Sequence, residues 1–341
     1  MPNLEPKRRP NYIMNGNFDI WQRGTGTAGG TRIPAGTKVA DRWQMAGNPG
    51  TGGTDIVSRQ SFLTGQTDVP GNPTYFYRWE ASGLSGTTSR EITHWIEDVR
   101  MLAGKTMTIV LYARGNPGGE NTWRLKVAQN MGVGGSGQVS AIDEIITVSG
   151  GSWGKIRFTF EMPTLSGATV GAVNTSATSV TLYKTDGSGA PIGSGTWLLD
   201  LAQMSLVEGA NELPFSLMGG TTGEELSLCQ RYYEKSYNKG ISPSTITNAG
   251  QVTFPYKNGD PKLNDWIVCP VRFKVEKRTT PAAISYSPVT GVPYTVSTDG
   301  PDAQDGATMA VIGTSGFEVV RNPGQSVAGT MYFHWTADAD F

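Results

Sequence analysis

Apolar and polar residues alternate along several stretches of the chain, which is the period of β-strands that bury one face. The clearest stretches are residues 123–129, 155–161 and 266–277. Residues 106–113 are apolar on both faces, which is typical of a strand in the centre of a core. The same reasoning predicts further strands at residues 180–183, 197–207, 307–312, 316–320 and 330–336.

One segment, residues 224–234, has the pattern of a helix instead. Thr222 and Glu225 have the spacing of a capping box, in which Thr222 is the N-cap and Glu225 lies three residues later. Apolar residues then recur at helical spacing and form one apolar face. We expect this face to pack against the C-terminal sheet or a neighbouring subunit, through Leu226, Cys229, Tyr232 and Tyr233.

The helix separates two tracts that are rich in strand patterns and turn residues. With 45 Gly and 20 Pro in 341 residues, the composition suits many short strands joined by turns. We therefore predict an all-β protein with two β-sandwich, jelly-roll-like domains joined by one short helix. The predicted parts are an extended arm (1–10), an N-terminal sandwich (11–215), a helical junction (216–240) and a C-terminal sandwich (241–341), the last expected to oligomerise.

The charge and hydropathy patterns argue against two classes of partner. The net charge is −1 and no extended basic tract occurs, so nucleic-acid binding has little electrostatic support. No apolar run reaches the length of a membrane span, and no signal peptide is visible, so we expect a soluble protein made in a cytoplasm. The one basic cluster, Lys7, Arg8 and Arg9, is interpreted as a solvated arm or, alternatively, as an attachment peptide that docks into a larger assembly.

Residues that commonly carry catalysis or bind metals are scarce. The only histidines, His94 and His334, lack the context of a nucleophile elbow and are interpreted as ordinary strand or loop residues. Cys229 and Cys269 are too few for a zinc site, so we expect buried free thiols and leave a disulfide as the alternative. Residues 302–306 favour a solvated turn over a calcium loop. The sequence therefore predicts no catalytic residue, no metal and no cofactor.

Nine tryptophans in a polar β-protein suggest glycan binding, because sugar rings stack on exposed aromatic faces. A Trp at an alternating strand position is usually part of the core, so few of them should be exposed. Trp95, which is flanked by Gly- and Ser-containing loops, is the preferred glycan-stacking residue, and Trp43 is the second candidate. The full set of candidates is Trp43, Trp79, Trp95, Trp123, Trp153 and Trp266.

Three parts of the chain carry a resemblance to a known group. Residues 15–25 and 40–43, starting at Asn15-Gly16-Asn17-Phe18, resemble the opening of many tailed-bacteriophage fibre and appendage proteins. Residues 208–215 and 223–236 are similar to the junction of those proteins, and residues 332–339 to their ending. The resemblance implies a virion structural protein with all-β domains, commonly trimeric and attached to the tail, collar or head. It supplies no catalytic residues.

The expected function is therefore a fibre or appendage of a bacteriophage virion that mediates attachment to host-surface glycans without catalysis. Its expected partners are two further copies in a homotrimer, other virion proteins and host polysaccharide, and its expected location is the virion. One alternative is a glycan-degrading tailspike enzyme, although the chain lacks the repeat of a parallel β-helix. The other alternative is an architectural decoration protein without a ligand.

Overall fold

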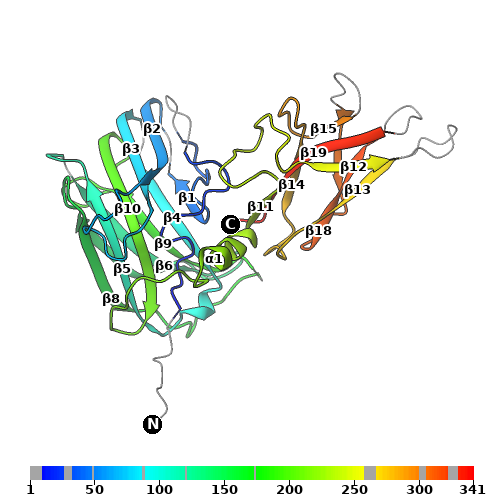
Figure 1. The fold of residues 1–341 in the computed structure, drawn as a ribbon. Coiled ribbons are helices and arrows are strands. Elements are labelled where there is room, and N and C mark those ends of the chain that lie inside the picture. Colours follow the sequence, from blue (N-terminus) through cyan, green and yellow to red (C-terminus); the bar gives the residue numbers. More distant parts are fainter. Residues whose placement is uncertain are drawn as a thin grey trace, which may run out of the picture. The chain divides into compact units, whose positions relative to one another are not determined.

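The computed structural model describes residues 10–341, except residues 27–32, 48–49, 87–88, 120, 173, 257–265, 299–304 and 322–328. The basic cluster at residues 7–9 and most of residues 302–306 therefore lie outside the described residues. The chain divides into two compact units (Figure 1). The first unit contains Met1–Ile20 and Gly26–Glu225, and the second contains Trp21–Thr25 and Leu226–Phe341. The predicted junction, residues 216–240, is thus shared between the two units.

The first unit is a β-sandwich of two five-stranded antiparallel sheets, as the alternating patterns predicted. The strands of sheet I are, in spatial order, β1 (Trp43–Ala46), β4 (Glu91–Glu97), β9 (Ala177–Lys184), β6 (Thr122–Asn130) and β7 (Val139–Thr147). The strands of sheet II are β2 (Gly52–Ser61), β3 (Tyr75–Ser85), β10 (Gly195–Glu208), β5 (Thr106–Gly115) and β8 (Gly154–Glu161). A 3₁₀ turn, η1 (Val99–Met101), precedes β5.

Aromatic rings and one ion pair hold the two sheets together. Trp79 and Trp197 from sheet II and Trp123 from sheet I form a buried cluster, with ring centroids 5.7 to 6.5 Å apart. Edge-to-face packing of this kind is favourable for aromatic rings beyond the area that they bury. Asp55 in β2 pairs with Arg90, directly before β4, and both side chains are fully buried. The core of this unit is thus mainly apolar but contains one charged cross-link between its sheets.

Asn15 orders the opening segment of the first unit. Its side chain donates hydrogen bonds to the carbonyl oxygens of Ile20 (2.8 Å) and Asp41 (3.0 Å), and its side-chain oxygen accepts one from the Ile20 amide (3.0 Å). The backbone of Asn15 is left-handed, with φ of 53°, a conformation that Asn tolerates better than most residues. This residue therefore joins the two parts of the chain, residues 15–25 and 40–43, that carry the opening pattern.

The helix α1 spans Thr222–Gln230, so it begins near the predicted start and ends earlier. Tyr233 is not helical but opens strand β11 (Tyr233–Lys235), which corrects its placement on the helical face. Cys229, Tyr232 and Tyr233 are buried, as expected, whereas Leu226 is only half-buried. The helical periodicity of the sequence continued past Gln230, but pairing of β11 with the long strand β19 (Gly329–Asp338) ends the helix.

The capping box of α1 lies one residue before the predicted position. The Glu224 amide donates to Thr221 Oγ1 (3.3 Å), and the Thr221 amide donates to Glu224 Oε2 (3.1 Å). The predicted partner, Glu225, has another role: its buried carboxylate accepts hydrogen bonds from the amides of Gly219 (2.7 Å) and Asn15 (2.5 Å). Burial raises the pKa of Glu225, and these two hydrogen bonds oppose that rise. The prediction of Thr222 as N-cap is therefore wrong.

Replacing Thr221 with Ala should lower the free energy of unfolding by about 1 kcal/mol, because the N-cap side chain satisfies an orphan amide of the helix. Thr222→Ala is the matched control, since Thr222 is exposed and should tolerate the change within about 0.5 kcal/mol. Urea unfolding of both variants measures the difference. A larger loss for Thr222→Ala than for Thr221→Ala would show that the cap is assigned to the wrong residue.

The second unit also consists of two packed antiparallel sheets. In the larger sheet, β19 pairs with β11, β12 (Val252–Tyr256), β14 (Ala282–Tyr286) and β15 (Thr295–Thr298), and β15 pairs with β16 (Asp305–Gly306). The smaller sheet contains β13 (Ile267–Arg272), β18 (Gly316–Arg321) and β17 (Thr308–Ala310). Side chains from both sheets form one core, which includes Cys269, Val271, Phe317, Val319, Met331, Phe333 and Trp335.

The predicted strand 266–277 ends at Arg272, and the turn that follows it contains a buried lysine. Lys277 Nζ donates to Glu234 Oε2 (2.6 Å) and to the carbonyl oxygens of Gln230 (2.7 Å) and Val275 (2.7 Å). Both charged side chains are fully buried. The three protons of the Lys277 ammonium therefore all have acceptors, which compensates the cost of burying the Lys277–Glu234 ion pair.

The short segment Trp21–Thr25 completes the second unit. Gln22 Nε2 donates to the carbonyl oxygen of Tyr233 (2.8 Å), and Arg23 forms ion pairs with Asp338 (2.9 Å) and Asp340 (3.2 Å). The Arg23 guanidinium also lies 3.7 Å from the centroid of the Tyr233 ring. A piece of chain near residue 23 is therefore built into the unit that otherwise starts at Leu226.

Both cysteines are buried free thiols, as expected, and burial raises the pKa of Cys269 to about 11. Across the described part of the chain, no helix is long and apolar enough to cross a membrane.

Candidate functional site

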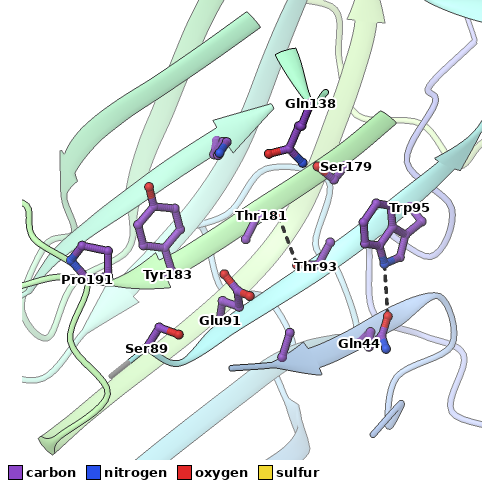
Figure 2. A pocket seen from close by; sticks show the side chains of 12 residues that line it. Gln44, Ser89, Glu91, Thr93, Trp95, Gln138, Ser179, Thr181, Tyr183 and Pro191 are labelled. Atoms are coloured by element: carbon purple, nitrogen blue, oxygen red, sulfur yellow. Dashed lines mark hydrogen bonds between the residues drawn. The ribbon is translucent and has the colours of Figure 1, made fainter. Parts of the chain in front are cut away.

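An open groove of about 470 Å³ lies on the outer face of sheet I in the first unit (Figure 2). The outward-facing residues of neighbouring strands form its floor, and loop residues form its edges. Because side chains alternate between the two faces of a strand, these residues sit between the inward-facing residues of the core. The lining residues are Gln44, Ala46, Ser89, Glu91, Thr93, Trp95, Lys126, Gln138, Ser179, Thr181, Tyr183 and Pro191.

The strand register arranges the floor in rows that run across the sheet. One row contains Gln44, Thr93, Thr181, Lys126 and Asp143, from β1, β4, β9, β6 and β7. The next row contains Ala46, Glu91, Tyr183, Arg124 and Ile145. On the other side of the first row, Trp95 lies opposite Ser179.

Two aromatic rings lie toward opposite ends of the groove, Trp95 and Tyr183 (Figure 2). They are on β4 and β9, and their positions differ by four residues along the strand direction, or about 13 Å at the usual rise of a strand. Trp95 is half-buried, and its indole N–H donates to Gln44 Oε1 (3.1 Å). Arg42 Nη2 donates to the carbonyl oxygen of Trp95 (2.6 Å). These bonds hold the ring in place and leave part of it accessible.

Tyr183 is fixed by charged neighbours from β6 and β7. Its hydroxyl donates to Asp143 Oδ1 (2.8 Å), and Arg124 Nε lies 2.6 Å from the same oxygen. Burial, the hydrogen bond to Asp143 and the charge of that carboxylate raise the pKa of Tyr183, while Arg124 opposes them. The Tyr183 side chain is therefore neutral at physiological pH, and the hydrogen bond to Asp143 orients its hydroxyl. Between the two aromatic residues, the hydroxyls of Thr93 and Thr181 share a hydrogen bond of 3.0 Å.

Glu91 is a half-buried carboxylate on the floor of the groove. Burial raises its pKa, and the nearby charges of Lys126 and Arg90 oppose that rise. Among the described residues that line the groove, Glu91 is the only carboxylate. Hydrolysis of a glycosidic bond usually requires two carboxyl groups that flank the bond, so the lining offers only half of that arrangement. Within the described residues, no group of three or more His, Cys, Asp or Glu side chains could hold a metal ion.

A second hollow, of about 570 Å³, lies on the outer face of sheet II, and its amide and carboxylate side chains are already engaged. Gln203 Nε2 donates to the carbonyl oxygen of Pro70 (2.6 Å), and Glu212 pairs with Lys155 (3.1 Å). In the groove on sheet I, by contrast, the charged side chains of Glu91 and Lys126 make no hydrogen bond or ion pair with another described residue. The groove on sheet I is therefore the stronger candidate.

The structure separates the two tryptophans that the sequence favoured. Trp95 lines the groove. Trp43 is only 2% exposed and faces the core, with its ring centroid 5.0 Å from those of Phe18 and His94. Its indole N–H donates to the carbonyl oxygen of Asn15 (3.2 Å). Trp43 cannot present a face to a sugar, and its prediction as a glycan-stacking residue is wrong.

The sequence analysis did not predict Tyr183, Glu91 or Lys126 as residues of the site. Glu91 and Lys126 lie in strand patterns that indicate an outward-facing residue, but outward-facing residues occupy both outer faces of a sandwich. The two histidines are structural, as predicted. His94 packs against Trp43, and His334 bonds to Ser236 (2.9 Å) and to the carbonyl oxygen of Thr247 (2.9 Å).

No protein-family model matches the sequence, and no curated protein sequence matches it. Solved structures that share similarity include the N-terminal cellulose-binding domain of β-1,4-glucanase C from Cellulomonas fimi. It is 15% identical, with a TM-score of 0.29, and the match covers 42% of this chain and 88% of that domain.

Two further matches have TM-scores of 0.34. One is the C-terminal family 22 carbohydrate-binding module of Clostridium thermocellum Xyn10B, 12% identical, covering 53% of this chain and 93% of that one. The other is the enzymatically active domain of tailspike protein 4 from bacteriophage CBA120, 9% identical, covering 58% of this chain and 21% of that one. Similarities this weak do not assign a function to the chain.

Proposed function

We propose that this protein binds a glycan in the groove on sheet I and does not cleave it. The observation that carries this proposal is the half-buried Trp95 ring, held at one end of an open polar floor, with the largely buried Tyr183 side chain lining the other end. A sugar has apolar ring faces and polar hydroxyls, and a binding site for it must match both. Preformed concave sites with a few fixed polar groups are the usual geometry for small-ligand recognition.

We further propose that the protein acts as a structural component of a bacteriophage virion, a fibre or appendage that attaches to the host surface as a homotrimer. The support is the resemblance of residues 15–25, 40–43, 208–215, 223–236 and 332–339 to the corresponding parts of such proteins. Immunogold labelling of intact particles tests the location, and light scattering after size exclusion tests the trimer. If the protein is a monomer and the antibody does not label intact particles, the proposed virion role fails, and the proposal of glycan binding is unaffected.

Replacing Trp95 with Ala should weaken glycan binding at least tenfold, because loss of a central aromatic contact commonly costs more than about 2 kcal/mol. The measurement is binding of the full chain to an array of bacterial surface polysaccharides and common microbial and plant glucans. Trp266→Ala is the matched control, since Trp266 is 59% exposed and lies in the second unit.

Three results would contradict the proposal. Absence of binding to every glycan on the array would favour the architectural alternative. Equal binding by the Trp95→Ala and Trp266→Ala variants would place the site elsewhere. Release of oligosaccharides from a bound polysaccharide would show catalysis and favour the tailspike alternative.

A further inference from the structure

Several polar side chains around the groove bind one another, but its two charged side chains do not. Trp95 bonds to Gln44, Thr93 bonds to Thr181, and Tyr183 joins the Asp143–Arg124 pair. In contrast, the Glu91 carboxylate and the Lys126 ammonium make no hydrogen bond or ion pair with any other described residue. Both line the groove. They are therefore the charged groups that the fold leaves available to a ligand.

Glu91 and Lys126 are placed on either side of the middle strand of the floor. Glu91 lies opposite Tyr183, and Lys126 lies opposite Thr181, so β9 runs between them. Two strand spacings and two residues of rise separate their Cα atoms by about 12 Å. Both side chains are long, and the charge of Lys126 is close enough to affect the pKa of Glu91. The space between the two charged ends is thus part of the groove, with hydroxyl-bearing residues beneath it.

The charges of the lining residues favour one class of glycan. The lining residues that the structure describes include one acid and one base, so they carry no surplus of positive charge to attract an anion. A half-buried carboxylate repels a second negative group more strongly than an exposed one, because water screens the repulsion less. A sugar hydroxyl, however, can donate to a carboxylate, and the oxygen of another hydroxyl can accept from an ammonium.

We propose that the groove selects uncharged glycans over acidic ones, with Glu91 accepting a hydrogen bond from one sugar hydroxyl and Lys126 donating one to another. This inference rests on the glycan binding proposed above and specifies the class of glycan. In it, Glu91 and Lys126 are residues that determine specificity, while the half-buried Trp95 supplies contact area that charged and uncharged sugars share.

Pairs of polymers that share a backbone and differ in whether they carry carboxylates test this selection directly. The probes are dextran with carboxymethyl dextran, hydroxyethyl cellulose with carboxymethyl cellulose, and carboxyl-reduced hyaluronan with hyaluronan. Affinity electrophoresis of the full chain should show retardation by the uncharged member of at least one pair and at least tenfold weaker retardation by its acidic counterpart. Tighter binding of the acidic member would overturn the proposal.

Variants of the two charged residues give the second test. Glu91→Gln and Lys126→Met should each weaken binding of the uncharged polymer about tenfold, because hydrogen bonds to charged groups are roughly twice as strong as neutral ones. Glu91→Gln should also reduce the discrimination against the acidic member. Glu80→Gln is the matched control, since Glu80 is exposed on a strand of sheet II. Circular dichroism confirms that each variant is folded.

A pH profile distinguishes a direct role of Glu91 from a structural one. Lys126 on β6, Tyr183 on β9 and the neighbouring Arg90 surround this carboxylate, and burial raises its pKa despite the two positive charges. Affinity for the uncharged polymer should therefore fall as the pH drops through that raised pKa, where the carboxylate takes up a proton. The Glu91→Gln variant should lack this fall. The same pH dependence in both would contradict a direct contact.

The two proposals fail in different ways. If the wild-type protein retards no polymer and binds no array glycan, glycan binding itself fails, and the selection fails with it. If the Trp95→Ala variant loses binding while the Glu91→Gln and Lys126→Met variants retain it fully, the groove binds glycans, but Glu91 and Lys126 do not determine its preference for uncharged ones.

Discussion

The Lys277→Met variant should lose about 3–5 kcal/mol of the free energy of unfolding, which is among the largest effects expected for a single substitution. Lys277 and Glu234 are both fully buried, and their ion pair is 2.6 Å long. Removing the ammonium leaves the Glu234 carboxylate buried without its compensating charge. It also removes the donor to the carbonyl oxygens of Gln230 and Val275. Urea or thermal unfolding measures the loss.

Lys274→Met provides the matched control for this prediction. Lys274 lies in the same turn, and its side chain is exposed, so the substitution removes the same charge without burying an uncompensated partner. Its effect should stay within about 0.5 kcal/mol. The double variant Lys277→Met/Glu234→Leu should recover part of the loss, because removing both members removes the uncompensated charge. Equal stability of the two single variants would contradict the assigned role of the pair.

Trp123→Ala is the second substitution with a large expected effect, a loss of about 3–5 kcal/mol in the first unit. Trp123 is fully buried, and its ring contacts those of Trp79 and Trp197, which come from the opposite sheet. The substitution leaves a cavity between the two sheets, where neighbouring side chains can collapse only partly. Differential scanning calorimetry should show the loss as a lower transition temperature.

The control for Trp123→Ala is Trp266→Ala, which removes the same side chain from an exposed position. Its stability should change by no more than about 0.5 kcal/mol. The contrast matters because both tryptophans occur in similar β-patterns of the sequence. A loss of stability for Trp266→Ala as large as that for Trp123→Ala would mean that Trp266 is covered in solution, for example by another copy of the chain.

The class of fold was predictable from the sequence because alternation is a local signal. Each strand that buries one face repeats its apolar residues every second position, and the alternating stretches at residues 123–129 and 155–161 became β6 and β8. The stretch that is apolar on both faces, residues 106–113, became β5. The helix α1 was also predictable, but its cap was not. Thr221 with Glu224 and Thr222 with Glu225 have the same spacing, and the choice depends on Asn15, which lies 210 residues away and binds Glu225.

The groove was less predictable, for a different physical reason. Local alternation could have excluded Trp43, since Trp43 and Met45 alternate with Gln44 and so belong to the buried face. Along the same lines, Trp95 lies an odd number of residues from Ile92 and Ile96, so alternation places Trp95 on the outer face when these two residues are buried. The neighbours of Trp95, however, come from strands far apart in the chain. Only the sheet order β4-β9-β6 brings Glu91, Tyr183 and Lys126 together, and that order depends on long-range pairing.

Because the segment Trp21–Thr25 belongs to the second unit, this unit folds through contacts between residues that are far apart in the sequence. Arg23 contacts Asp338 and Asp340 across separations of 315 and 317 residues. The entropy of closing so long a loop grows only with the logarithm of its length, about 0.6 kcal/mol for each doubling, but contacts of this kind slow folding. A fragment that starts at Leu226 would contain every strand of the second unit and still lack the guanidinium that joins these carboxylates to the Tyr233 ring. Such a fragment would regain these contacts only if residues 21–25 were supplied as a separate peptide, as in fragment complementation of a split protein.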